Sequence, residues 1–415
     1  MGNDDAAAAE ARASLARANR IVIKIGTSTI MRRDTVMKDD GARRDGSGRD
    51  GALDVEYLHR VADQIARLAR AGKQPLVVTS GAIGMGAREL GLARRVTELR
   101  MRQACAAIGQ IALMDEYRRA FGVFGLTPAQ LLVTRDSWDN RSAYLNLRAS
   151  VETLLERGAV PVFNENDVVS TAEIGNAFGD NDQLSAYIAS KVDAEVLIIL
   201  SDIDALYDAD PRGDSAARPI AYVGELSPEI LASAGGAGTE FSTGGMATKL
   251  KAVAIARDAG CRVVIADGRV EGVISRILAG ESVGTLFDAA HGLKNRQRWI
   301  KNSRPQGSIA IDEGALAAIR SKKSLLPRGV KAVEGRFARG DVVLVGCLAL
   351  EGGTIGEGEA LLAEGAAKVV TSLSSDELER VLGRKSDELE TILGAGAAKI
   401  VARPEETVFL ENYVG

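Results

Sequence analysis

The stretch Arg20-Ile21-Val22-Ile23-Lys24-Ile25-Gly26-Thr27-Ser28 combines a short apolar run with a lysine and a glycine near its carboxyl end. A short apolar run bounded by turn signals predicts a buried β-strand, here Arg20 to Ile25. Downstream, Asp54 to Ala71 has the apolar spacing of an amphipathic helix and is followed by Gly72, a residue common after helix ends. Pro75 to Thr79 then predicts a second strand. The fold therefore begins as strand, helix, strand.

The same alternation of strands and helices continues far along the chain. Apolar runs of strand length recur at 130–133, 160–163, 196–200 and 262–265, and segments with helical spacing at 98–120, 142–157, 245–259 and 273–278. Strands that alternate with helices of this length predict a mostly parallel sheet that is covered by helices on both faces. The predicted fold class is α/β, a three-layer sandwich with a mostly parallel sheet.

The length of the chain and a change of pattern after Leu293 predict two domains of unequal size. The chain has 415 residues, more than the roughly 250–300 at which one hydrophobic core stops growing. Beyond a charged connection, Ser308 to Cys347 has the pattern strand, short helix, basic turn, strand, which predicts a smaller, β-rich domain. We therefore expect an N-terminal extension (1–19), a large α/β domain (20–290), a linker (291–304) and a small domain (305–415).

The segment 32–51 interrupts the large domain between its first strand and its first long helix. It is rich in Arg, Asp and Gly and has few apolar residues, so it can add little to a hydrophobic core. We expect a surface insertion. Its acidic residues nearly balance its basic ones, which argues against a basic arm that binds nucleic acid.

Composition and charge exclude several classes of protein. The formal net charge is −4, with 26% charged residues of both signs, which disfavours nucleic acid and membrane surfaces as partners. The segment 6–20 is rich in Ala and Arg like a transit peptide, but Asp4, Asp5 and Glu10 argue against one. No apolar run approaches the ~18 residues that span a bilayer. Three widely separated cysteines favour a reducing environment. We expect a soluble, cytoplasmic protein.

Polar clusters follow the ends of the predicted strands. They are Lys24 to Ser28, Thr79 to Ala82, Asn164 to Asp167 and Ser201-Asp202, and between the last two Gly179 to Asp182 begins a predicted helix. Each cluster alone is typical of a turn or a helix cap. Parallel strands end at the same edge of a sheet, and ligands of such sheets bind at that edge, so several clusters together predict a ligand site.

A second candidate feature is Thr243-Gly244-Gly245-Met246-Ala247-Thr248-Lys249, which opens a predicted helix. Glycine lets the backbone approach an anion, a helix N-terminus offers free N–H groups, and the lysine adds a positive charge. The segment is not a Walker A loop, because no glycine directly precedes Lys249. It predicts a phosphate site, and a glycine-rich connection with a solvated lysine remains the alternative.

Phosphoryl transfer is the chemistry that these residues suit best. The two histidines, His59 and His291, have no partner at metal-ligand spacing, which argues against zinc hydrolysis and histidine acid–base catalysis. No nucleophile elbow surrounds Ser80. Lys24 and Lys249 stand at two glycine-rich corners, and phosphoryl transfer needs positive charge and in-line positioning more than covalent help.

Five motifs together resemble those of the amino-acid kinase family, and within it of the glutamate 5-kinases. They are Val22 to Thr29, Val77 to Ala82, Val162 to Asp167, Gly179 to Ser185 and Thr243 to Lys249, in the order expected for the family. The tail from about Arg304 resembles the PUA domain that many members carry, most clearly at 311–315 and 324–329. The resemblance implies an amino-acid kinase fold followed by a PUA-like domain.

This resemblance implies transfer of the γ-phosphoryl group of ATP to the side-chain carboxylate of L-glutamate, with Mg²⁺ on the phosphates, as the first step of proline biosynthesis. By position, Lys24 and Lys249 flank the phosphoryl group, and Asp182 holds both lysines by charge-assisted hydrogen bonds. The positions that match glutamate-binding residues are Ser80, Asp167 and Asn181. The positions that match ATP-binding residues are Lys24, Ser201, Asp202, Thr243, Gly244, Gly245, Met246, Ala247, Thr248 and Lys249. Asp180 matches a residue that orients a magnesium-bound water.

The chain departs from the family pattern at three places, one of which is the segment 32–51, longer than in typical members. Ala247 replaces a hydroxyl residue that is common in the nucleotide loop, so one phosphate contact would fall to backbone N–H groups. The segment 175–178 differs within a loop that covers glutamate and binds the feedback inhibitor proline in the family, so sensitivity to proline is open. The resemblance also favours a homodimer or homotetramer joined through the kinase domain.

Two other functions stay open at this point. A related kinase for aspartate, N-acetylglutamate or a nucleotide would keep the fold and both lysines, although aspartate kinases usually carry regulatory domains of another kind. The other is RNA binding through the tail, where there is a basic stretch made of Lys322, Lys323, Arg328, Lys331 and Arg336. A solvated surface is the simpler interpretation of that stretch.

Overall fold

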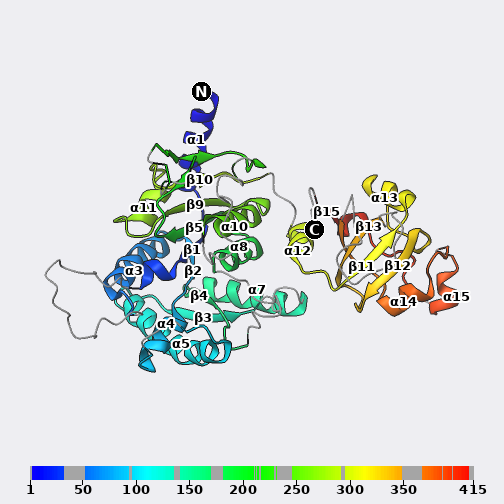
Figure 1. Cartoon of the computed structure of the whole chain (residues 1–415), viewed down its shortest axis with the longest axis horizontal. Helices are drawn as coiled ribbons and strands as arrows, with labels where there is room; N and C mark the ends of the chain where they lie inside the picture. Colours follow the sequence, from blue (N-terminus) through cyan, green and yellow to red (C-terminus); the bar gives the residue numbers. More distant parts are fainter. Residues whose placement is uncertain are drawn as a thin grey trace. The chain divides into compact units, whose positions relative to one another are not determined.

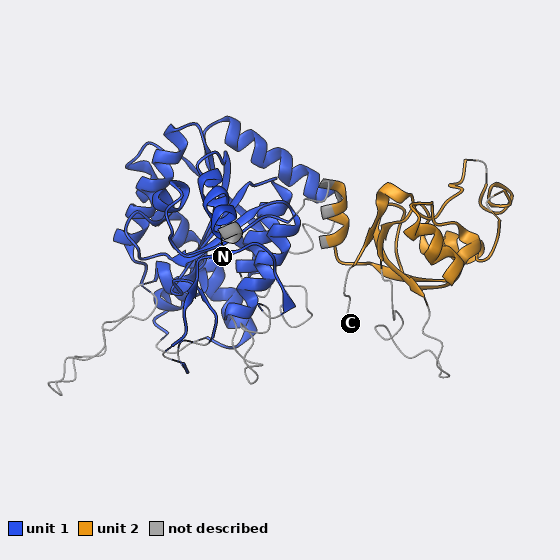
Figure 2. Cartoon of the chain, turned by 90° about the horizontal axis from the view of Figure 1, so that it is seen from above, with its two compact units in different colours: residues 1–292 blue, residues 293–415 orange. Residues whose placement is uncertain are grey.

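The computed structural model divides into two compact units, residues 1–292 and 293–415 (Figure 2). The residues it describes are 2–31, 52–92, 96–134, 141–169, 181–209, 211, 213–214, 216–228, 230, 245–290, 295–347, 367–385, 387–394 and 396–410. The predicted insertion 32–51 lies outside these ranges. On either side of it, Met31 and Leu53 form an antiparallel bridge.

The first unit is built on an eight-stranded sheet. Its strands are β1 (Arg20–Ile25), β2 (Gln74–Val78), β3 (Pro128–Val133), β4 (Val160–Glu165), β5 (Val196–Ser201), β8 (Tyr222–Val223), β9 (Arg262–Asp267) and β10 (Thr285–Phe287). They lie in the order β3-β4-β2-β1-β5-β9-β10-β8, and each neighbouring pair is parallel except β9 and β10. The prediction of a mostly parallel sheet is confirmed.

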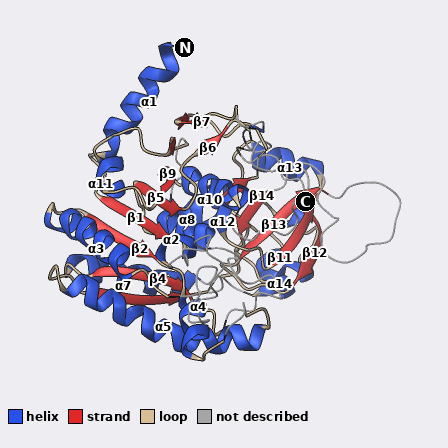
Figure 3. Ribbon diagram, turned by 60° about the vertical axis from the view of Figure 1, so that its left-hand side comes forward, coloured by secondary structure: helices blue, strands red, loops and turns tan. Residues whose placement is uncertain are grey.

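Helices cover both faces of this sheet (Figures 1 and 3). Those described are α1 (Gly2–Leu15), α2 (Thr27–Ile30), α3 (Val55–Arg70), α4 (Ala82–Glu89), α5 (Leu99–Gly122), α7 (Arg141–Glu156), α8 (Asn181–Lys191), α10 (Met246–Asp258) and α11 (Val273–Leu278). Figure 1 shows α3 and α11 on one side of the central strands and α8 and α10 on the other. The three-layer architecture is therefore also confirmed.

Strand β1 shows why both faces must be covered. Ile21, Ile23 and Ile25 lie in a hydrophobic cluster with α3 and α11, whereas Val22 lies in a second cluster with α8 and α10. Successive side chains of a strand point to opposite faces, so an uninterrupted apolar run suits a strand that is buried on both sides. Lys24 is the polar exception, and it lies at the carboxyl end of the strand.

The predicted strands and helices of this unit are all present, with ends within two residues of those expected. The sequence pattern did not predict the short strands β8 and β10, nor the hairpin of β6 (Leu206–Tyr207) and β7 (Pro219–Ile220). Two or three residues are too few to establish the alternation of apolar and polar residues that marks a strand.

The predicted N-terminal extension contains helix α1, which is anchored by a buried arginine. The Arg12 guanidinium donates to the main-chain oxygens of Glu281 (2.8 Å), Ala221 (2.8 Å) and Gly284 (3.0 Å). Burial lowers the pKa of Arg12. These hydrogen bonds satisfy carbonyl groups of the segments around β8 and β10, so α1 helps to hold that end of the sheet in place.

The second unit is rich in β-structure, as predicted. It contains β11 (Gly307–Ile311), β12 (Val330–Gly335), β13 (Val342–Cys347), β14 (Ala367–Val370) and β15 (Thr407–Phe409), in the order β12-β11-β13-β14-β15. Its α-helices in the described ranges are α12 (Asn295–Asn302), α13 (Glu313–Arg320), α14 (Ser375–Arg380) and α15 (Leu389–Leu393). Helix α14 begins with a capping box formed by Ser374 and Glu377.

The segment 291–304, predicted as a linker, contains α12. The Lys368 ammonium, on β14, donates to the main-chain oxygens of Lys301 and Ser303, at 2.8 Å each. A cation at a helix C-terminus pairs with carbonyl groups that have no partner inside the helix.

Among the helices of the described ranges, none is long and apolar enough to cross a membrane.

Candidate active site

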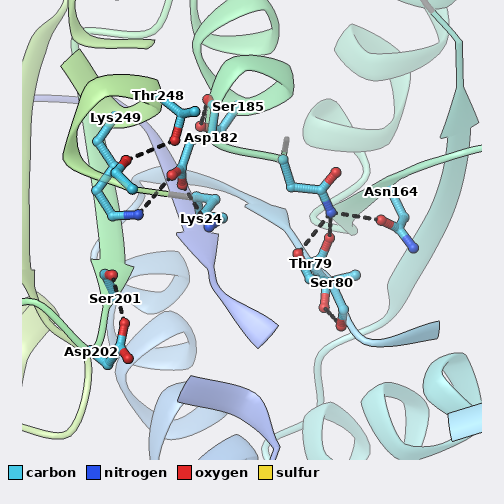
Figure 4. Close-up of polar contacts among 12 residues, drawn as sticks. Lys24, Thr79, Ser80, Asn164, Asp182, Ser185, Ser201, Asp202, Thr248 and Lys249 are labelled. Atoms are coloured by element: carbon cyan, nitrogen blue, oxygen red, sulfur yellow. Dashed lines mark hydrogen bonds and ion pairs between the residues drawn. The ribbon is translucent and has the colours of Figure 1, made fainter. Parts of the chain in front are cut away.

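Three charged side chains from three elements meet at the carboxyl end of β1 (Figure 4). Lys24 belongs to β1, Asp182 to the first turn of α8, and Lys249 to the first turns of α10. The Nζ of Lys24 lies 2.6 Å from Oδ1 of Asp182, and the Nζ of Lys249 lies 2.9 Å from Oδ2. One carboxylate thus contacts both ammonium groups. We call these three residues the lysine–aspartate cluster.

Local structure explains how these side chains come together. Helices α8 and α10 pack against each other, and α8 also packs against β1. Asp182 lies at the N-terminal end of α8, where the helix dipole favours a negative charge. Gly26 follows the strand, and a Cβ atom there would lie 3.3 Å from Nζ of Lys24. A side chain at this position would therefore crowd the ammonium group.

The lysine–aspartate cluster is buried, and its three residues comprise two positive charges and one negative charge. The side chains of Lys24, Asp182 and Lys249 are 6%, 0% and 5% exposed. Burial alone would raise the pKa of the Asp182 carboxyl, but Lys24 and Lys249 hold it below its usual range. Two ammonium groups therefore contact one carboxylate. Buried ammonium groups are stabilised by anionic partners, so the cluster suits an anionic ligand.

Uncharged polar residues form a second group beside this cluster, centred on the side-chain amide of Asn181. Its Nδ2 shares its two hydrogens among three acceptors: the main-chain oxygen of Thr79 (2.6 Å), Oγ of Ser80 (2.8 Å) and Oδ1 of Asn164 (3.0 Å). Figure 4 shows Thr79, Ser80 and Asn164 on the other side of the view from Lys249. The structure thus brings together Ser80 and Asn181, both predicted to bind substrate.

Helix α5 makes two further hydrogen bonds to this group. Nδ2 of Asn164 donates to Oε1 of Gln110 (2.9 Å), and the Tyr117 hydroxyl donates to Oγ1 of Thr79 (2.9 Å). We call Asn181, Ser80, Thr79, Asn164 and Gln110 the amide cluster. Sequence reasoning placed Asn164 in a polar cluster at the end of a strand but gave it no role, and it did not single out Gln110 or Tyr117. A glutamine or a tyrosine inside a helix gives no comparable signal.

Asp167, also predicted to bind substrate, lies in the turn after β4. Burial, and secondarily the neighbouring carboxylate of Glu165, raise its pKa to about 6, although Arg102 opposes the shift. Within the described residues no hydrogen bond or ion pair joins Asp167 to Ser80 or Asn181. A carboxylate that is poorly solvated and close to another carboxylate favours a cation as partner.

The predicted nucleotide residues lie at the ends of β5 and α10. Oγ of Ser201 donates to Oδ1 of Asp202 at 3.3 Å. Gly245 is the residue before α10, and its main-chain oxygen accepts a hydrogen bond from Oγ1 of Thr248 (2.8 Å). Met246 and Ala247 follow in the first turn of the helix. Thr243 and Gly244 lie outside the described residues.

Magnesium has no dedicated protein site in the part of the chain that the structure describes. No group of three or more His, Cys, Asp or Glu side chains is arranged there to hold a metal ion. Asp180 and the segment 175–178 lie outside the described residues. The residues present fit a metal ion that is held mainly by phosphate oxygens and water, as Mg²⁺ often is.

Comparison with known proteins assigns the chain to a family. Residues 19–267 match the amino acid kinase family, and residues 307–393 match the PUA domain. The chain belongs to the amino acid kinase family and carries a PUA domain. The resemblance inferred from five sequence motifs and from the tail is therefore confirmed.

Similar proteins point to one kinase within this family. The chain is 45% identical to the glutamate 5-kinase of Methanosarcina acetivorans, over 89% of this chain and 90% of that protein. It is 44% identical to the glutamate 5-kinase of Methanosarcina barkeri, over 95% and 97%. It is 41% identical to the glutamate 5-kinase of a Ruegeria species, over 89% and 96%.

Proposed function

We propose that this chain is a glutamate 5-kinase, which transfers the γ-phosphoryl group of ATP to the side-chain carboxylate of L-glutamate. The product is L-glutamyl 5-phosphate, and the reaction begins proline biosynthesis. The similarity to glutamate 5-kinases over nearly the full chain supports this function. It does not favour the alternatives, a kinase for another amino acid or an RNA-binding protein.

The observation that carries the reaction is the lysine–aspartate cluster. Its two buried ammonium groups contact the same carboxylate, so two positive charges lie beside one negative charge within these three residues. In phosphoryl transfer, charge spreads over the oxygens of the transferred group, and the enzyme acts mainly by positioning and by electrostatic stabilisation. A buried cluster of this kind supplies fixed positive charge where water would otherwise have to reorganise.

Each member of the cluster has a distinct role in this proposal. Lys24 and Lys249 bind the phosphate oxygens and stabilise the charge that develops on them during transfer. Asp182 is a positioning residue, because each of its oxygens holds one ammonium group. Its lowered pKa keeps it ionised at neutral pH, so it does not take a proton from either lysine.

The amide cluster and Asp167 form the glutamate side of the site. The Ser80 hydroxyl accepts a hydrogen bond from Asn181, so its own proton can be donated to a substrate carboxylate. Asp167 binds the substrate ammonium group, which supplies the cation that its environment favours. With a pKa of about 6, its carboxylate is ionised at neutral pH.

ATP occupies the side of the site formed by Ser201, Asp202 and the segment from Thr243 to Lys249. The N–H groups at the start of α10 and the Lys249 ammonium suit its phosphates. Mg²⁺ bound to the phosphates neutralises part of their charge. In this arrangement the carboxylate of glutamate and the polyphosphate, which repel each other, are both surrounded by hydrogen-bond donors and cations.

A direct assay tests the proposal. We expect ADP release from MgATP in the presence of L-glutamate, and hydroxylamine should trap the acyl phosphate as a hydroxamate. Aspartate and N-acetylglutamate, at the same concentrations, should give neither product above background. Hydroxamate formation with aspartate or N-acetylglutamate in preference to glutamate would overturn the choice of substrate.

A further inference from the structure

One main-chain oxygen determines the direction of the hydrogen bonds in the amide cluster. The carbonyl of Thr79 can only accept, so the atom of Asn181 that lies 2.6 Å from it must be the nitrogen Nδ2. The same nitrogen faces Oγ of Ser80 and Oδ1 of Asn164. The N–H groups of Asn181 are thus directed to the protein. Its Oδ1 accepts no hydrogen bond from the described residues.

The orientation of the Asn181 amide also fixes the direction of the hydrogen bonds that Asn164 and Gln110 make. Since Oδ1 of Asn164 accepts from Asn181, Nδ2 of Asn164 points the other way, where Oε1 of Gln110 accepts at 2.9 Å. If the Asn164 amide turned over, its Nδ2 would face Nδ2 of Asn181, and two donors would oppose each other. Gln110 is the acceptor that keeps Asn164 in the observed orientation.

Burial makes this acceptor difficult to replace. Gln110 is 8% exposed and Asn164 is 3% exposed. Water therefore has little access to the Asn164 amide from the side of α5. A buried amide that loses its partner tends to reorient toward another one, because an unpaired buried N–H group is costly.

We infer that Gln110 is a positioning residue for substrate recognition: by holding Asn164 as an acceptor for Asn181, it reinforces the amide orientation that Thr79 sets, in which Oδ1 of Asn181 faces the substrate as an acceptor. The inference rests on the proposed glutamate site. Ser80 then offers a hydroxyl donor and Asn181 an oxygen acceptor, side by side. This pair complements a ligand with a carboxylate and an adjacent ammonium group, as in an unmodified α-amino acid.

Two substitutions of Gln110, supported by a matched control, test this role. Gln110→Met removes the acceptor at similar volume, and we expect the KM for glutamate to rise about tenfold, a typical effect of a misplaced hydrogen bond. The kcat and the KM for ATP should stay within about twofold. Gln110→Glu keeps an oxygen facing Asn164 and should restore the KM for glutamate to within about threefold of wild type.

The matched control is Gln103→Met, the same change on α5 at a side chain without a hydrogen bond to any described residue. It should leave all three kinetic constants unchanged. Because Gln110 acts through Asn164, Gln110→Met should add no further change in a chain that already carries Asn164→Ala. Thermal unfolding of every variant reports whether a kinetic change reflects a loss of folded protein.

Several results would overturn the inference. They are an unchanged KM for glutamate in Gln110→Met, additive effects with Asn164→Ala, or equal impairment in Gln110→Glu and Gln110→Met. If Gln110→Met does not fold, Gln110→Glu still decides, since a raised KM in a stable Gln110→Glu protein contradicts the role. Ser80→Ala separates this inference from the proposed site. If Ser80→Ala leaves the KM for glutamate unchanged, the site itself is wrong; if it raises the KM while Gln110→Met does not, only the role of Gln110 fails.

Discussion

The lysine–aspartate cluster and the amide cluster lie at the same edge of the sheet and are largely buried, with Asn181 partly exposed, but they use opposite chemistry. The first consists of charged groups held by one carboxylate. The second consists of neutral amides and hydroxyls held by directed hydrogen bonds. Charge stabilises a reaction in which charge moves, whereas neutral groups with a set direction discriminate between ligands. We expect the first cluster to govern kcat and the second to govern the KM for glutamate.

Two consecutive residues at the start of helix α8 belong to different clusters. Asn181 contacts the ends of β2 and β4, whereas Asp182 contacts Lys24 on β1 and Lys249 on α10. Neighbouring residues of a helix point about 100° apart, so one helix end can address two partners of different kinds. The proposed transfer takes place between them, from the nucleotide on one side to the carboxylate on the other.

The largest effect should come from Lys249→Met. We expect kcat to fall by about 10²- to 10³-fold, as when one group that stabilises transition-state charge is lost, with the KM for glutamate within about threefold. Asp182 keeps Lys24 as a partner, so the protein should remain folded. Lys251→Met, at an exposed position of α10, is the matched control and should be fully active. Steady-state kinetics of both variants check this prediction. If the two kcat values agree, Lys249 has no role in the mechanism.

The next largest effect concerns how α5 reaches the amide cluster. A Cβ atom on Gly109 would lie 1.8 Å from the main-chain oxygen of Ala82 on α4. Gly109→Ala should therefore force the helices apart, lower the free energy of unfolding by about 1–3 kcal/mol and displace Gln110. Gly122→Ala, on the same helix but with no atom within 4 Å of the added Cβ, is the control.

Urea unfolding and glutamate kinetics of both glycine variants check this prediction. In Gly109→Ala, the KM for glutamate should rise more than kcat falls, because α5 serves the amide cluster and not the lysines. A Gly109→Ala protein as stable as Gly122→Ala, with an unchanged KM, would show that α4 and α5 need not approach so closely.

The two clusters also differ in how far they could be predicted from the sequence. Lys24 and Lys249 stood out because glycines surround them, and the family resemblance joined them to Asp182. Local pattern alone could not place three residues so far apart in sequence within hydrogen-bonding distance. Gln110 and Arg12 gave no signal, because a polar residue in a helix is usually solvated and its burial is decided by tertiary packing.

The longer strands could be predicted because their own apolar composition specifies them. The apolar run of β1 specifies a strand covered on both faces, since each of its alternating side chains needs an apolar partner. Short strands such as β10 pair because their neighbours present free backbone groups, not because of their own composition. Elements of this kind depend on the assembled sheet.

The pH dependence should separate two carboxylates of the site that are shifted in opposite directions. The pKa of Asp167 is raised to about 6, mainly by burial, while that of Asp182 is lowered by its two lysines. Between pH 7 and pH 5, Asp167 takes up a proton and loses its attraction for the substrate ammonium group. The KM for glutamate should therefore rise about tenfold or more, while kcat at saturation holds.

Asp167→Asn provides the check on that assignment. Its KM for glutamate should be high at pH 7 and should change little down to pH 5. The stability of the wild-type protein should change with pH in the opposite direction to its affinity for glutamate. Since the folded state binds the Asp167 proton more tightly than the unfolded state, the raised pKa costs stability at neutral pH; that cost shrinks as the pH falls below about 6 and is gone only below the ordinary aspartate pKa of 3.8. Asp167→Asn should therefore unfold at higher urea concentration than wild type at pH 7. A wild-type KM that is flat from pH 7 to pH 5 would contradict the role of Asp167.

The smallest effect, and the sharpest test of the division, comes from two serines. Ser80→Ala removes a hydroxyl that accepts a hydrogen bond from Asn181. It should raise the KM for glutamate about fivefold, a typical effect of losing one neutral hydrogen bond, and should not lower kcat. Ser185→Ala makes the same change beside the lysine–aspartate cluster. Among the described residues, its hydroxyl donates to the main-chain oxygen of Asp182 within α8, at 2.6 Å, so the KM for glutamate should stay at the wild-type value. If Ser80→Ala lowers kcat and leaves the KM unchanged, the amide cluster takes part in the transfer itself, and the separation of binding from chemistry along α8 does not hold.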